Sequence, residues 1–134
     1  MGKLTSQQAN QLSNNFLGLA QAIGDYRFKN WSSLSRKDNQ HLASFQWSLL
    51  NHGEDMLAFS ATLVFNEVAE SLATIQALTD NIQNTIIKLQ AVQKVIDIAA
   101  CAVTLGAAII SRDINAISEG LKTFVETTKT NDES

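Results

Sequence analysis

The chain contains no proline in 134 residues, and its six glycines are scattered. Proline ends a helix more strongly than any other residue, because it lacks the backbone N–H and its ring clashes with the preceding turn. Apolar residues recur at steps of three and four, which is the spacing of one helix face, and strict alternation typical of strands is missing. The sequence therefore predicts an all-α protein.

The helix boundaries predict an antiparallel bundle of three long helices and a shorter C-terminal helix. The first helix is expected over residues 6 to 29, and the second over 37 to 78, continuous through Gly53 because Leu49 and Met56 keep the same phase. A turn is expected at Thr79 and Asp80, whose short polar side chains compete for backbone hydrogen bonds. The third helix then runs from 81 to 110, and the last follows residues 111 to 113. The stripe that the first helix should bury consists of Ala9, Leu12, Phe16, Leu19, Ile23 and Tyr26.

A chain of this length, with 45% hydrophobic residues, has the size and core of one domain. We expect a single domain over residues 1–134. The polar ends, 1–5 and 128–134, are expected to fray.

Residues 95 to 110, VIDIAACAVTLGAAII, carry a single charge at Asp97. The uncharged part is shorter than the roughly 17 to 25 residues that span a bilayer, and half of it is alanine or glycine. A helix that is apolar on all sides normally lies in the middle of a bundle, so we expect this helix to be central. Asp97 lies either at its rim, where Lys94 is three residues away, or in the core, where it would be a buried, acid-sensitive switch.

The residues that carry common enzyme chemistry do not form a recognisable site. Neither His41 nor His52 has a glutamate three residues before it, as di-metal helical bundles require, and both are expected to be polar surface histidines. Phosphate-binding glycine loops and nucleophile motifs are missing as well. We expect no enzyme activity, no cofactor and no metal.

Residues 26 to 37, YRFKNWSSLSRK, interleave aromatic and basic side chains and contain four of the ten basic residues. Such a segment can anchor at lipid headgroups or stack on bases. Alternatively, the aromatic rings cover the end of the bundle while the bases solvate the loop. The candidate interaction surface consists of Tyr26, Arg27, Phe28, Lys29, Trp31, Arg36 and Lys37.

These patterns favour a non-catalytic bundle that acts through self-association, as a dimer or larger, or through another protein. A contact with a membrane is an open alternative, and nucleic acid is not expected as a partner because the net charge is −3. Two other functions also stay open. The protein could be soluble but membrane-active, hiding helix 95–110 as pore-forming proteins do, or it could bind a small ligand between helices.

The N-terminus bears on where the protein resides. It lacks the apolar run of a signal peptide, so a cytoplasmic location is expected. Gly2 and Ser6 match the short N-myristoylation pattern.

Overall fold

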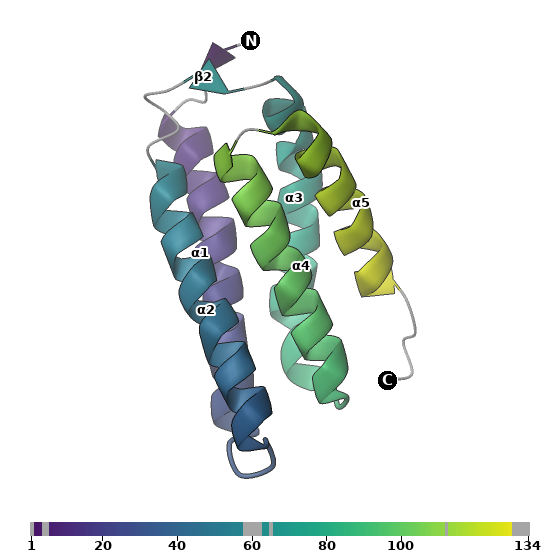
Figure 1. Ribbon diagram of the computed structural model, residues 1–134. Coiled ribbons are helices and arrows are strands. Elements are labelled where there is room, and N and C mark those ends of the chain that lie inside the picture. The colour runs from purple at the N-terminus through teal and green to yellow at the C-terminus, as the bar shows by residue number, and fades with distance from the viewer. Residues whose placement is uncertain (1, 4–5, 58–62, 65, 112, 130–134) are drawn as a thin grey trace.

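Five α-helices form a bundle in the computed structural model, which describes residues 2–3, 6–57, 63–64, 66–111 and 113–129 (Figure 1). Side chains are described for 7–57, 73–111, 113 and 115–129. The predicted all-α helical bundle is confirmed. The helices are α1 (Ser6–Lys29), α2 (Arg36–Met56), α3 (Asn66–Thr85), α4 (Val92–Ser111) and α5 (Ile114–Lys129).

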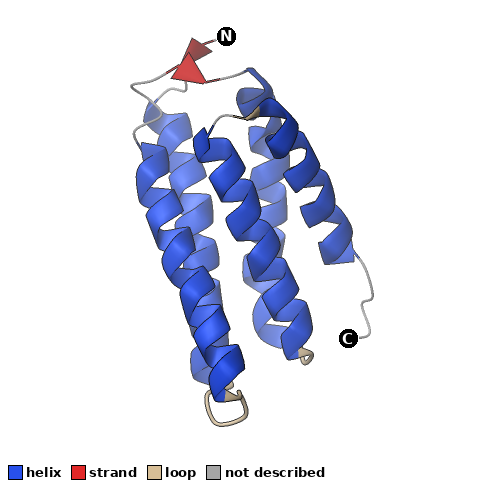
Figure 2. Ribbon diagram, viewed as in Figure 1, coloured by secondary structure: helices blue, strands red, loops and turns tan. Residues whose placement is uncertain are grey.

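Three shorter elements are described as well. A 3-10 helix, η2 (Ile86–Lys88), follows α3. The two-residue strand β1 (Gly2–Lys3) pairs antiparallel with β2 (Leu63–Val64), at one end of the bundle (Figure 2). This pairing joins the beginning of the chain to the connection between α2 and α3.

Successive helices run in opposite directions, with α2, α4 and α5 in front and α1 and α3 behind in Figure 1. α1 packs on α2 and α3, α4 packs on α2 and α5, and α3 completes the ring by contacting α5. All six residues of the stripe predicted for the first helix are buried. The core is therefore the space that the five helices enclose.

The α1–α2 pair is closely packed along its length. The Ser13 hydroxyl on α1 is buried and donates a hydrogen bond to the Gly53 carbonyl on α2, at 2.6 Å. In a longer helix the N–H of Leu57 would bond that carbonyl, but it lies against the carbonyls of Asp55 and Glu54 instead. Ser13 thus satisfies a carbonyl that the end of α2 leaves without its helical partner.

Two predicted boundaries are wrong. α2 continues through Gly53 as predicted but ends at Met56, so the single helix expected over 37–78 is two helices, α2 and α3. The turn expected at Thr79 and Asp80 lies inside α3. Thr79 is fully buried, and its hydroxyl donates to the Gln76 carbonyl at 3.1 Å, so this side chain bonds within the helix instead of ending it. The chain turns after η2, at the extended residue Leu89.

α4 has the central place expected for residues 95–110, between α2 and α5 (Figure 1). It is not enclosed on every side, however. Nine of its residues are buried, whereas an outward face lies exposed to solvent. The exposed residues of this face are Gln93, Asp97, Thr104, Ala107 and Ser111.

The two expected tails are partly ordered. Gly2–Lys3 forms β1, and α5 extends to Lys129. The remaining residues of both tails lie outside the described residues.

Candidate functional site

The loop between α1 and α2 is folded by its own hydrogen bonds. The Asn30 side chain donates to the Tyr26 carbonyl at 3.0 Å, and the Leu34 N–H donates to the Asn30 carbonyl at 3.0 Å. Ser35 caps α2, because its hydroxyl accepts the N–H of Asp38 at 3.0 Å. The loop therefore presents its side chains from a defined backbone.

Two aromatic side chains project from this end of the bundle. Phe28 is 85% exposed and Trp31 is 60% exposed. The Arg27 guanidinium lies 5.8 Å from the centre of the Trp31 ring, a cation–π distance, and it donates to Asn39 at 2.7 Å and to Gln46 at 2.8 Å. Arg27 thus links the exposed indole to α2.

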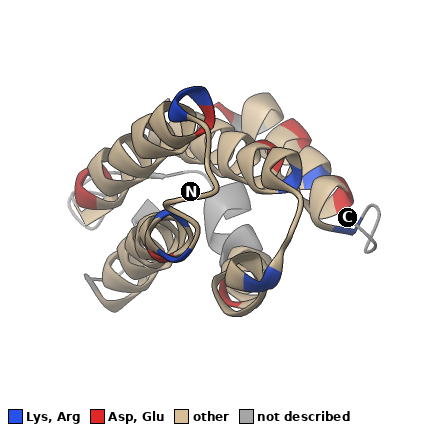
Figure 3. Cartoon of the chain, turned by 90° about the horizontal axis from the view of Figure 1, so that it is seen from below, with Lys and Arg blue, Asp and Glu red and all other residues tan. Residues whose placement is uncertain are grey.

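The same end is basic. Lys29, Arg36 and Lys37 are exposed, and the Lys29 amine donates to the Ile87 carbonyl at 3.3 Å. Residues 27 to 37 contain four basic and no acidic residues, so the rest of a chain of net charge −3 sums to −7. Figure 3 shows basic residues where α1 and α2 meet their connecting loop. We call this surface the basic aromatic tip, and it consists of Arg27, Phe28, Lys29, Trp31, Arg36 and Lys37.

Tyr26 does not belong to the tip, which corrects the sequence-based surface. Its side chain is 1% exposed and continues the buried stripe of α1. Burial raises the pKa of the Tyr26 phenol, and the Asp38 carboxylate adds to the effect. Tyr26 therefore holds the tip in place from beneath.

Trp47, which is 67% exposed on α2, was not predicted as a surface residue from the sequence. A signal was present, because Trp47 lies two residues before the stripe residue Leu49 and so points off the buried face. It lies outside the tip, about 16 Å along α2 from Arg36 at 1.5 Å per residue.

Asp97 is not a buried switch. It is exposed on the outward face of α4 and accepts a hydrogen bond from Gln93 at 2.9 Å. Lys94 reaches α5 and donates to the Thr127 carbonyl at 2.9 Å. The rim placement is confirmed, and the acid sensitivity that required a buried Asp97 has no basis.

The two histidines differ from each other. His41 is exposed and stacks on Phe45, with ring centres 5.4 Å apart. His52 is half-buried, and burial lowers its pKa in spite of the opposing effects of the Asp55 carboxylate and a hydrogen bond to the Val103 carbonyl. The surface prediction is therefore wrong for His52, which lies three residues after Leu49 and so on the buried stripe.

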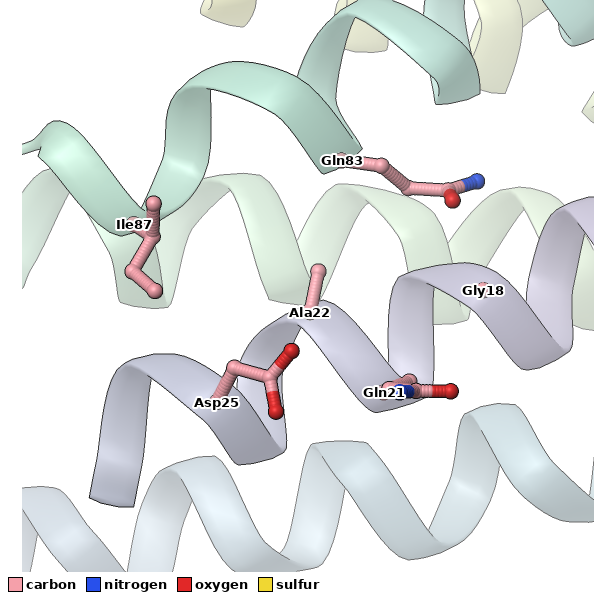
Figure 4. Close-up of a pocket in the computed structure, with 6 residues that line it drawn as sticks. All are labelled: Gly18, Gln21, Ala22, Asp25, Gln83 and Ile87. Carbon is pink, nitrogen blue, oxygen red and sulfur yellow. The ribbon is translucent and has the colours of Figure 1, made fainter. Parts of the chain in front are cut away.

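Hollows lie between helices in the part of the chain that the structure describes. One, of about 290 Å³, lies between α1 and the α3–η2 segment (Figure 4). Its polar side chains are Gln21 and Asp25, which are exposed, and Gln83, which is half-buried, and its volume lies at the small end of ligand pockets. It is lined by Gly18, Gln21, Ala22, Asp25, Gln83 and Ile87.

Two further observations concern chemistry and membranes. Within the described residues, no group of three His, Cys, Asp or Glu side chains is placed to hold a metal ion. In the same part of the chain, α4 is the one helix long and apolar enough to cross a membrane, and half of that segment is buried.

Comparisons with protein families, curated proteins and solved structures found no match to this chain.

Proposed function

We propose that this protein is a non-catalytic interaction protein that binds a partner protein through the basic aromatic tip. The observation that carries the proposal is the exposure of Phe28, in the last turn of α1, and of Trp31, in the hydrogen-bonded loop that follows. Full burial of one large apolar side chain contributes about 1.5–3 kcal/mol. The two rings are largely exposed in the free protein, so most of this free energy is not gained there. A partner that covers them recovers this free energy.

The composition of the tip supports the same proposal. Tryptophan and arginine are enriched among residues that dominate binding energies at protein interfaces. Trp31 and Arg27 are already in contact, and the backbone beneath them is hydrogen-bonded, so little conformational entropy is lost on binding.

The charge of the tip indicates the kind of surface that the partner presents. Four bases without an acid favour a surface whose rim is acidic around an apolar pocket. The rest of this chain, with its charge of −7, offers acidic surface, so a second copy is the first partner to test.

Light scattering at micromolar concentration tests self-association. We expect the wild-type protein to form a dimer or larger species, and Phe28→Ser with Trp31→Ser to be monomeric. Trp47→Ser is the matched control, because it removes an equally exposed ring outside the tip and should leave the assembly unchanged.

A photo-cross-linking residue at position 28, compared with one at position 47, tests a different partner in the cell that makes the protein. We expect a specific protein adduct from position 28 alone. A monomeric wild-type protein that also gives no adduct specific to position 28 would refute the proposal.

A further inference from the structure

His52 lies at the meeting point of three helices. A Cβ atom placed on Gly106 of α4 would be 2.7 Å from His52 Cδ2 and 3.1 Å from Phe16 Cε2 of α1, so both rings lie directly against the α4 backbone. The His52 ring is hydrogen-bonded to the Val103 carbonyl, also on α4. We call this contact between α2 and α4 the His52 seam.

One nitrogen of the ring has no partner. Among the described residues, none makes a hydrogen bond to His52 Nε2, and the atom is buried. Protonation makes both ring nitrogens donors, so the ring then carries a positive charge and a buried N–H at Nε2 that has no acceptor among the described residues.

The surroundings offer that charge little compensation. Asp55, exposed on α2, is the carboxylate that acts on His52. The neighbouring Glu54 is exposed as well. On α1 and α4 the nearest charged residues are Asp25 and Asp97, each nine positions along its helix from Phe16 or Gly106, about 13 Å away.

We propose that protonation of His52 opens the His52 seam and lets α4 bind a lipid bilayer. This inference does not use the basic aromatic tip, and so it stands apart from the proposed function.

The sign of the effect follows from linkage. The closed seam lowers the pKa of His52 below about 6.5, so the open state binds the proton more tightly. Closure is therefore fully favoured above about pH 6.5 and loses favour as the pH falls through the pKa of the closed state. For each pKa unit by which closure lowers the pKa of His52, the ratio of open to closed molecules rises up to about tenfold at low pH.

Among the described residues, α4 is the helix long and apolar enough to cross a bilayer. It has 20 residues, which is about 30 Å at 1.5 Å per residue, although its uncharged part alone, residues 98–111, is shorter than a full span. Its two charges, Lys94 and Asp97, lie near its beginning, and residues 98–111 carry none. Beyond Asp97 the exposed residues of its outward face are Thr104, Ala107 and Ser111, which are uncharged, and the Ser111 hydroxyl donates to the Ala108 carbonyl at 3.0 Å.

Flotation with phosphatidylcholine vesicles at about pH 7.5 and about pH 5 tests the proposal. These vesicles carry no net charge, so the basic tip contributes no attraction. We expect a larger fraction of the wild-type protein to float at the lower pH, with release of an entrapped dye, because the open state binds the proton more tightly. His52→Gln, which can still hydrogen-bond but does not titrate, should stay in solution at both pH values.

His41→Gln is the matched control, because it removes the other histidine from an exposed position and should float like the wild type. If His52→Gln does not fold, NMR of the wild-type protein replaces it. The His52 ring signals and the amide exchange of α4 should then change with one midpoint, below about pH 6.5.

Three results would overturn the proposal: a wild-type protein that stays in solution at both pH values, a folded His52→Gln variant that floats like the wild type, or binding of an apolar dye at low pH without flotation. None of them bears on the tip, whose failure the light-scattering and cross-linking experiments detect separately.

Discussion

Gly106 lies where three helices leave no room for a side chain. An added Cβ would meet the His52 ring at 2.7 Å and the Phe16 ring at 3.1 Å. Both rings are held between helices, so relief requires that α2 or α1 move away from α4.

Gly106→Ala should lower the free energy of unfolding by about 1–2 kcal/mol. Overpacking costs about 1–3 kcal/mol, and the better helix propensity of alanine returns part of it. Gly120→Ala on α5 is the control, since its Cβ would lie 3.6 Å from the nearest atom, Leu105 Cα. That variant should be more stable by about 0.5–1 kcal/mol in urea unfolding, and a loss at Gly120 as large as at Gly106 would contradict the steric explanation.

Single residues also show how much of the candidate site could be predicted from the sequence. The density of aromatic and basic side chains predicted the exposed Phe28 and Trp31. Tyr26 belongs to the same segment but also to the buried stripe of its helix, and its side chain is buried. The same periodicity placed His52 on the buried face, where its polarity suggested the opposite. Its contact with Gly106 depends on how α2 and α4 pack, which no local pattern encodes.

At the scale of elements, Ser35 and Asp80 show that a short polar side chain marks a helix boundary at one position and not at the other. Ser35 caps α2 with a hydrogen bond to the Asp38 N–H. Asp80, where the sequence predicted a turn, is an exposed residue inside α3.

Ser35→Ala and Asp80→Ala should therefore change stability in opposite directions. Loss of the Ser35 cap should lower the free energy of unfolding by about 1 kcal/mol. Alanine at position 80 should raise it by a few tenths to about 0.7 kcal/mol, because aspartate is a poorer helix former. Urea unfolding of both variants measures the difference. A loss of about 1 kcal/mol for Asp80→Ala would contradict the helical position of Asp80 and favour the turn that the sequence predicted.

The helical secondary structure was predictable because the spacing of apolar residues is a local property that is repeated over every segment. The first helix was predicted to within a residue, since the loop after it is rich in serine and a capping serine follows. The end of α2 at Met56 and the end of η2 at Lys88 are not marked by a proline, and residues 86–91 carry no glycine either. The local sequence therefore does not predict where these helices end.

At the scale of the whole molecule, charge is distributed unevenly along the bundle. The tip carries four positive charges, whereas the rest of the chain sums to −7. A protein with net charge −3 is repelled on average by an anionic surface, but attraction within a Debye length of about 8–10 Å depends on the local patch.

The protein should therefore be retained on a cation-exchange column at about pH 7 and low salt, in spite of its net charge. Arg36→Ser with Lys37→Ser should elute at lower salt, because both side chains are exposed at the tip. Lys122→Ser with Lys129→Ser is the matched control, since these exposed lysines lie on α5 and either pair of changes takes the net charge from −3 to −5. Equal shifts for the two variants would mean that net charge governs the contact, and an oriented approach through the tip would then lose its electrostatic basis.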